Sequence, residues 1–186
     1  MGPDPRRRIP SGYASVRSFP VVHVESAPPL DLATWDLRIG GAVERPFSAT
    51  WEEFRRLPHV VREADFHCVQ GFSRLGNRWE GVLLRDLLAR AAMRPVGRFV
   101  RVTDGRRYDT TIPLEVALRN DVMLSDVHDG RPLDLDHGAP VRLVVPAKLA
   151  WKSCKWVRTI EVLERDRLGF WESRGYSNDA DPFAER

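Results

Sequence analysis

The sequence predicts an α+β domain in which several β-strands are mixed with short helices. Short runs of alternating or β-branched apolar residues recur along the chain, which is typical of strands. Helix signals are brief, and two of them stop near a proline. The two kinds of signal do not follow the regular alternation of a parallel βαβ fold. A length of 186 residues suits a single domain with its own core, which we expect over residues 31–186.

The N-terminal part is expected to be an extended arm that leads into a strand. Residues 1–30 contain six of the 14 prolines, and residues 19–24 within them have the composition of an edge strand. Apolar and polar side chains alternate over residues 35–39, which predicts a half-buried strand. Gly40 and Gly41 are expected to end that strand.

A capped helix and a second strand are predicted next. Thr50 and Glu53 have the spacing of a capping box, so a short helix is expected to run to about Leu57 and to stop before Pro58. The apolar residues that follow predict a strand leading to Cys68.

The second half of the chain is predicted to mix strands with two more helices. Leucines at helical spacing over residues 84–91 predict a helix with one buried face, ending near Pro95. Pro113 is suited to open another short helix, through Leu118. Strands are predicted over residues 99–103, 141–145 and 156–163.

Composition excludes several classes of protein. The formal net charge is +3 and the arginines are spread along the chain, so no nucleic-acid partner is expected. No apolar run approaches the length of a membrane helix, and no apolar segment of a secretory signal follows the first arginines. We therefore expect no membrane span and a cytoplasmic location. Two cysteines without a Cys-x-x-Cys pattern suggest neither a disulfide scaffold nor a zinc site.

Cys68 admits three interpretations. A small buried apolar side chain is the commonest role of a lone cysteine. A nucleophile would need a base; the adjacent His67 would point to the opposite face of a strand, and His59, His128 and His137 are the distant candidates. A thiolate ligand to a transition metal would need positive charge nearby.

A basic group downstream favours an anionic ligand. It consists of Arg142, Lys148, Lys152, Lys155 and Arg158, interleaved with tryptophans. Burying a cation beside tryptophan is costly unless an anion pairs with it, and a phosphorylated cofactor would be such an anion. Ser153 could add a hydroxyl donor. The alternative interpretation is a solvated charged face.

Three blocks of residues, in order along the chain, resemble the sulfite oxidase-type molybdopterin oxidoreductases, and among them the stand-alone sulfite oxidase-like branch. They are residues 65–74 around Cys68, residues 137–143 (His-Gly-Ala-Pro-Val-Arg-Leu) and residues 151–156 (Trp-Lys-Ser-Cys-Lys-Trp). The resemblance implies the mixed-strand fold of that family's catalytic domain. It also implies a molybdenum–molybdopterin cofactor, with Cys68 at the metal-ligand position.

Other site residues follow from the same resemblance. The positions that contact the pterin and its phosphate are occupied by His23, Thr103, His137, Arg142, Ser153 and Lys155. Tyr108 is a candidate pocket tyrosine. Arg74, close after the metal ligand, is a candidate for attracting an oxyanion, and a solvated surface arginine is the alternative. Phe72 and Ser177 depart from the family's usual Trp and His, which affects the substrate pocket.

The implied function is oxygen-atom transfer on a small substrate, either a sulfite-like oxyanion or a sulfoxide. The haem and dimerisation domains of larger members have no counterpart here, so a separate electron-transfer partner is expected, such as a haem, flavin or quinone protein. The alternative is a non-catalytic module that binds the pterin or another phosphorylated ligand.

Overall fold

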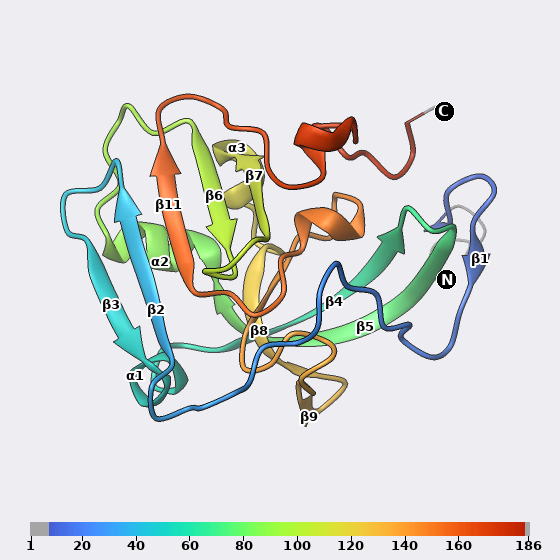
Figure 1. Cartoon of the computed structure of the whole chain (residues 1–186), viewed down its shortest axis with the longest axis horizontal. Helices are drawn as coiled ribbons and strands as arrows, with labels where there is room; N and C mark the ends of the chain where they lie inside the picture. The colour runs from blue at the N-terminus through green and yellow to red at the C-terminus, as the bar shows by residue number, and fades with distance from the viewer. Residues whose placement is uncertain (1–7, 185–186) are drawn as a thin grey trace.

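The computed structural model describes residues 8–184, so the first seven residues of the predicted arm lie outside it. Within that range the strands form two sheets joined by short helices (Figure 1). One sheet contains β1 (Ala14–Ser15), β4 (Val60–Cys68), β5 (Phe72–Leu83), β8 (Met123–His128), β9 (Arg131–Pro132) and β10 (Arg142–Val144). The other contains β2 (Asp36–Gly41), β3 (Phe47–Thr50), β6 (Phe99–Thr103), β7 (Asp109–Pro113) and β11 (Thr159–Leu163). The helical elements are α1 (Trp51–Arg55), α2 (Leu84–Arg90), α3 (Leu114–Ala117), and the 3-10 turns η2 (Ala150–Lys152) and η3 (Glu172–Arg174).

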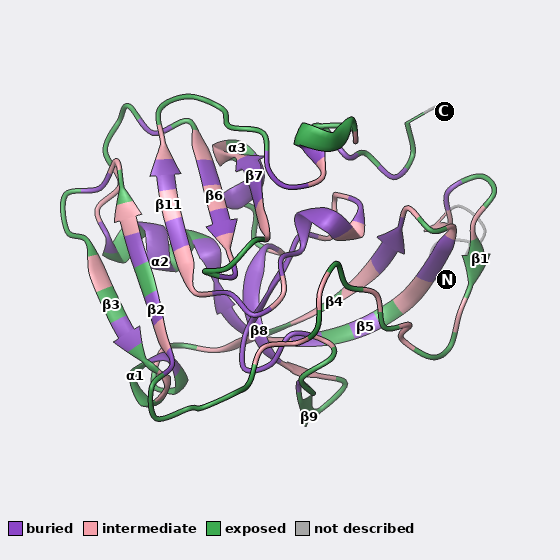
Figure 2. Ribbon diagram, viewed as in Figure 1, coloured by how far each residue is buried: buried purple, intermediate pink, exposed green. Residues whose placement is uncertain are grey.

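The sheet ordered β3-β2-β11-β6-β7 has one apolar and one charged face. Ile39, Val102 and Ile160 are buried in the main core, which also holds the leucines of α2. On the other face, the guanidinium of Arg101 forms ion pairs with the carboxylates of Asp109, at 2.7 Å, and Glu161, at 3.3 Å. The alternation of buried and half-buried residues along these strands is visible in Figure 2. It is the pattern expected for a sheet with one solvated face.

The β4–β5 hairpin positions Cys68 at the end of β4, where it pairs with Phe72 of β5. The connecting turn contains Gly71, whose φ of +87° suits glycine because other residues rarely adopt it. The backbone N–H of Gly71 donates to the carbonyl oxygen of Cys68 at 2.9 Å. The turn thus holds the cysteine at the rim of the sheet.

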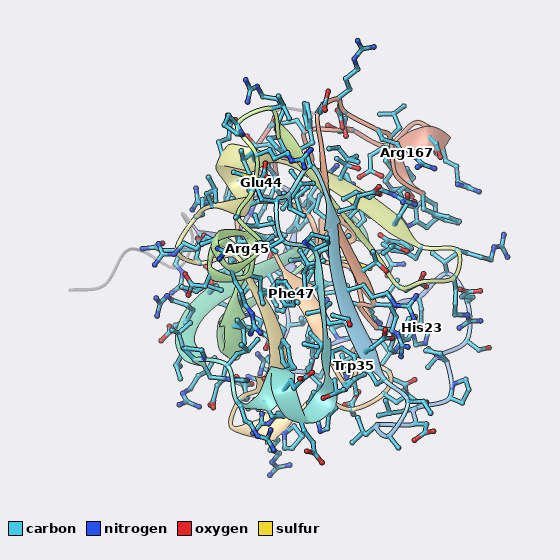
Figure 3. All side chains as sticks on the ribbon, turned by 90° about the vertical axis from the view of Figure 1, so that its left-hand side faces the viewer. His23, Trp35, Glu44, Arg45, Phe47 and Arg167 are labelled. Carbon is cyan, nitrogen blue, oxygen red and sulfur yellow. The ribbon has the colours of Figure 1, made fainter. Side chains whose placement is uncertain are left out.

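Two predicted strands differ from the structure. Residues 19–24 form no strand; they run as an irregular segment that includes His23, which Figure 3 shows on the opposite side of the molecule from Arg45. The strand predicted over residues 156–163 begins only at Thr159, because Trp156 has a φ of 53° that interrupts extended backbone. The helices within the described range are too short and too polar to cross a bilayer.

Candidate functional site

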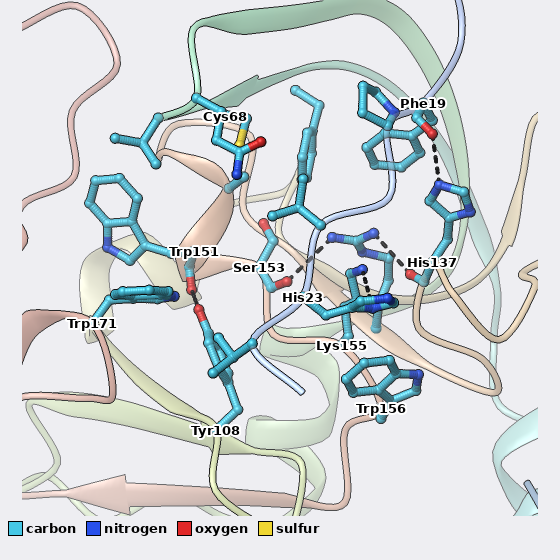
Figure 4. A pocket seen from close by; sticks show the side chains of 18 of the residues that line it. Phe19, His23, Cys68, Tyr108, His137, Trp151, Ser153, Lys155, Trp156 and Trp171 are labelled. Atoms are coloured by element: carbon cyan, nitrogen blue, oxygen red, sulfur yellow. Dashed lines mark hydrogen bonds between the residues drawn. The ribbon is translucent and has the colours of Figure 1, made fainter. Parts of the chain in front are cut away.

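A cavity of about 450 Å³ lies between the two sheets' loop ends and the N-terminal segment (Figure 4). Its lining comes from segments far apart in sequence: residues 19–25, 66–72, 104–108, 137–142, 150–156 and 171–176. Concave sites with convergent polar groups are the usual places for cofactors and small ligands. The cavity is therefore the candidate functional site.

Cys68 lines this cavity and is 5% exposed. Burial raises the pKa of its thiol, while the backbone N–H of Gln70 and the charge of Lys155 act in the opposite direction. The neighbouring His67 is engaged elsewhere, because its Nδ1 lies 2.8 Å from the hydroxyl of Ser73. Cys68 is therefore not activated by the adjacent histidine, which weakens its interpretation as a nucleophile.

Arg142 is a buried cation on the opposite part of the lining, with 2% exposure. Its Nη1 donates to the carbonyl oxygen of His137 at 2.9 Å and its Nη2 to that of Ser153 at 3.3 Å. Within residues 8–184, its Nε has no hydrogen-bond partner and no carboxylate forms an ion pair with it. Burial lowers the pKa of Arg142 to about 10. A buried guanidinium without a carboxylate is suited to bind an anion.

Lys155 supplies a second cation near Arg142. Its Nζ donates to the carbonyl oxygen of Asp136 at 2.6 Å and lies 3.4 Å from Nδ1 of His23. Burial and the charge of Arg142 lower the pKa of Lys155 to about 7, whereas the carboxylates of Asp136 and Asp134 act in the opposite direction. An anion bound here would stabilise the protonated amine.

Ser153 and Gly138 complete this part of the lining. The hydroxyl oxygen of Ser153 accepts from the backbone N–H of Val145 at 3.1 Å, so its proton remains available to a ligand. Gly138 has a φ of +116°, and a Cβ there would lie 3.0 Å from Cβ of Arg142 and 3.2 Å from that of Lys155. Glycine allows the loop to pass close to both cations.

His137 connects this loop to the N-terminal segment. Its Nδ1 lies 2.8 Å from the carboxylate of Asp134, and its Nε2 lies 2.9 Å from the carbonyl oxygen of Phe19. Its ring stacks on that of Phe19 at a centroid distance of 4.8 Å. Both ring nitrogens face acceptors, which fixes the orientation of the imidazole.

An anion should bind this site more weakly as the pH rises above about 7. Lys155 is protonated below its pKa of about 7, so binding there needs no proton uptake. Above that pH the free protein must take up a proton to bind, and affinity should fall by up to about tenfold per pH unit. Sulfate is the suitable probe because its charge is constant over this range, and isothermal titration calorimetry between pH 6 and 9 measures its affinity.

Lys155→Met is the matched variant for this measurement. It should weaken sulfate binding at low pH and remove most of the pH dependence. An unchanged pH dependence in the variant would show that another group titrates.

Three cations of the predicted basic group are paired with carboxylates of the chain itself and do not line the cavity. They are Lys148 with Asp179, Lys152 with Glu172, and Arg158 with Asp36. Lys152 and Glu172 are separated by 2.6 Å, and each side chain is 1% exposed. Carboxylates of the protein therefore neutralise these three cations. Of the predicted basic group, only Arg142 and Lys155 remain to bind an anionic ligand.

Two other predicted site residues are outside the lining. The guanidinium of Arg74 is hydrogen-bonded to Asn77 and Asp129, and Phe66 is its partner across the hairpin. The hydroxyl of Thr103 accepts from the backbone N–H of Gly105 at 3.0 Å. Neither residue is among those that line the cavity.

Sequence reasoning missed a carboxylate next to Thr103. Asp104 lines the cavity and is 4% exposed. Its Oδ1 accepts from the backbone N–H groups of Arg106 and Tyr108, and burial raises its pKa. The available signals were its position between a predicted strand and Gly105 and its place beside Thr103, which the family resemblance had singled out.

Aromatic side chains form the rest of the lining. The hydroxyl of Tyr108 donates to the carbonyl oxygen of Trp151 at 2.7 Å, and its ring stacks on Phe170 at 5.7 Å. Trp171 and Tyr176, from the C-terminal segment, pack on each other with their ring centroids 4.6 Å apart. Tyr108, the candidate pocket tyrosine of the sequence analysis, does line the cavity. Trp171 and Tyr176 were not predicted as site residues, because their segment has no regular pattern.

Residues 23–171 match a family model described as the oxidoreductase molybdopterin binding domain. The chain belongs to the sulfite oxidase-type molybdopterin oxidoreductases. The uncharacterized oxidoreductase YuiH of Bacillus subtilis is 34% identical over 97% of this chain and 91% of its own length. The protein-methionine-sulfoxide reductase catalytic subunit MsrP of Xanthomonas axonopodis is 31% identical, over 76% of this chain and 48% of its own.

A solved structure supports the same assignment. The sulfane dehydrogenase SoxCD of Paracoccus pantotrophus superposes with a TM-score of 0.67 at 26% identity, over 75% of this chain and 40% of that one. The predicted family and mixed-strand fold are confirmed. This member of the family is a molybdopterin-dependent oxidoreductase whose cofactor is molybdenum–molybdopterin.

The residues of the cavity fit such a cofactor. A thiol suits a soft transition metal, and a buried guanidinium with an unpartnered Nε suits a phosphate. The free proton of the Ser153 hydroxyl adds a neutral donor beside Arg142.

Proposed function

We propose that this oxidoreductase transfers an oxygen atom to or from a small substrate at molybdenum held by Cys68. The observation that carries the proposal is that Cys68 and the buried Arg142, which lie far apart in sequence, line one cavity. The thiol and the cation match the two chemically distinct parts of a metal-bearing, phosphorylated cofactor.

The proposed binding roles follow from contacts in the cavity. Arg142 and Lys155 pair with the phosphate, and Ser153 donates its hydroxyl proton to it. His137 and His23 pack along the pterin, since both lie next to these cations. A role of Thr103 stays a prediction, because only its neighbour Asp104 reaches the lining.

The proposed chemistry is divided between cofactor and protein. The bound cofactor supplies a metal that cycles between oxidation states and exchanges an oxygen atom. Cys68 ligates the metal, and its thiolate form becomes favourable because the metal offsets the cost of burial. Tyr108 lines the cavity with its hydroxyl fixed by Trp151, so it shapes the substrate space. The oxyanion role considered for Arg74 has no support from its contacts.

A separate redox protein is proposed to exchange electrons with this chain. The relative MsrP is named as a catalytic subunit, which supports a partner chain. A one-electron carrier such as a haem or flavin protein would complete the reaction.

Metal and pterin analysis tests the proposed function. Protein purified from a host that makes the cofactor should contain about one molybdenum and one pterin per chain. Inductively coupled plasma mass spectrometry measures the metal, and the fluorescence of the oxidised pterin measures the organic part. A second molybdopterin enzyme from the same host is the control. A loaded control beside a chain that contains neither component would contradict the proposal.

A further inference from the structure

The cavity has two chemically different ends, and Cys68 lies between them. Two residues before it, Phe66 packs beneath the guanidinium of Arg142 at 5.1 Å. One residue after it, Val69 packs against the cluster that contains Trp151. We call the first the cationic end (His23, His137, Arg142 and Lys155) and the second the aromatic end (Val69, Trp151, Trp171 and Tyr176).

Figure 4 shows this division directly. Trp151 and Trp171 lie to one side below Cys68, and His23, His137 and Lys155 lie to the other. The rings of the aromatic end pack on one another: the ring centroid of Tyr176 lies 4.6 Å from that of Trp171 and 5.1 Å from that of Trp151. Mutual ring contacts of this kind hold a binding wall in place.

The positive charge of the cavity is committed to the cationic end. Among the described residues that line it, Arg142 and Lys155 are the arginine and lysine, and both are proposed to pair with the phosphate. Arg74 is hydrogen-bonded to Asn77 and Asp129, outside the lining. An oxyanion in the aromatic end would lose its hydration without gaining a cation, which is unfavourable.

The aromatic end and the residues next to it include neutral hydrogen-bond donors. The indole Nε1 of Trp151 is buried and has no hydrogen-bond partner within residues 8–184, and the hydroxyl of Tyr176 and the exposed amide of Gln70 are further neutral donors on the lining. Such donors can satisfy the single oxygen of a polar but uncharged group. The aromatic rings beside them offer contact area to an apolar substituent.

We infer that the substrate is a neutral sulfoxide or thioether with an alkyl or aryl substituent, and not free sulfite. This inference rests on the proposed function and narrows its substrate class. In the reductive direction the S–O bond of the sulfoxide breaks, and two electrons and two protons convert its oxygen to water and leave the thioether. The electrons come from the one-electron redox partner, and the protons come from solvent.

The test compares two substrates on the molybdenum-loaded enzyme. Methyl phenyl sulfoxide is reduced with dithionite-reduced methyl viologen as electron donor, and sulfite is oxidised with ferricyanide as acceptor. We expect kcat/KM for the sulfoxide to exceed that for sulfite by at least about 100-fold. A higher kcat/KM for sulfite would overturn the inference and leave the proposed function standing.

Substitutions at Trp171 test whether the substituent of the sulfoxide contacts the aromatic end. Trp171→Ala should raise KM for methyl phenyl sulfoxide by about tenfold, with a smaller change for dimethyl sulfoxide, whose substituents are too small to cover the wall. Trp171→Phe, which keeps an aromatic ring, should recover most of the loss. Trp51→Ala, in α1 and outside the cavity, is the matched control and should leave both KM values unchanged. An equal rise in KM for both sulfoxides in Trp171→Ala would overturn the inference.

A binding measurement separates failure of the inference from failure of the proposed function. If neither substrate turns over although molybdenum and pterin are present, the proposed oxygen-atom transfer fails. Quenching of tryptophan fluorescence by methyl phenyl sulfoxide, weakened by Trp171→Ala and not reversed by sulfite, would still support the neutral site. Displacement of the sulfoxide by sulfite at equal concentration would overturn it.

Discussion

Replacing Cys68 with serine is expected to lower the rate of oxygen-atom transfer by at least about a thousandfold, roughly 4 kcal/mol at the transition state. A hydroxyl is a poor ligand for a metal that is otherwise held by sulfur, so both the reactivity and the retention of molybdenum should suffer. Serine is close to cysteine in size, so the protein should fold. The measurements are turnover with a viologen or ferricyanide couple, the molybdenum content, and the pterin content.

The chain offers a matched control in its other cysteine. Cys154 is fully buried and is not part of the cavity lining. Cys154→Ala should keep activity and lose some stability, because it removes a buried sulfur without exposing a polar group. Activity within tenfold of the wild type in Cys68→Ser would show that the sulfur is not a ligand.

Replacing Arg142 with methionine is expected to weaken cofactor retention by at least about 100-fold, close to 3 kcal/mol. The phosphate would be left without its buried partner. In the apoprotein, Arg142→Met should lower the free energy of unfolding by less than a substitution at a buried position usually does. Two hydrogen bonds to carbonyl oxygens disappear, but so does a desolvated charge without a carboxylate. The pterin remaining after dilution and gel filtration, and urea unfolding of the apoprotein, measure the two effects.

Lys152→Met is the comparison for Arg142→Met. It leaves the carboxylate of Glu172 buried without its cation, which should cost about 3–5 kcal/mol of folding free energy. Cofactor retention by the folded fraction should change little, because Lys152 does not line the cavity. Equal destabilisation by both substitutions would mean that Arg142 stabilises the fold in its own right.

Elements with local signals were predictable from the sequence. The strand at residues 99–103 has the bounds of β6, and Thr50 and Glu53 form the expected capping box of α1. Their patterns depend on near neighbours, so propensity and capping chemistry describe them. The family's blocks likewise predicted that Cys68 and Arg142 would share a site, and the cavity brings them together.

Features that depend on distant partners were not predictable. β5 contains Gly76, Asn77 and Gly81, which read as turn residues, yet pairing with β1, β4 and β8 makes them a strand. The partner of Lys152 is Glu172, which the sequence pattern does not identify. The irregular C-terminal segment supplies an aromatic wall only because it folds back over the cavity.

The N-terminal segment of residues 19–25, which lines the cavity, bears on how the cofactor enters the protein. It is attached through the carbonyl of Phe19 to His137 at 2.9 Å and through the carboxylate of Glu25 to Arg106 at 3.3 Å. None of residues 19–25 belongs to a strand. Lifting the segment therefore disrupts no ladder of backbone pairs. We therefore expect the cofactor to enter where this segment lies, because the segment can detach from the folded domain by losing side-chain contacts alone.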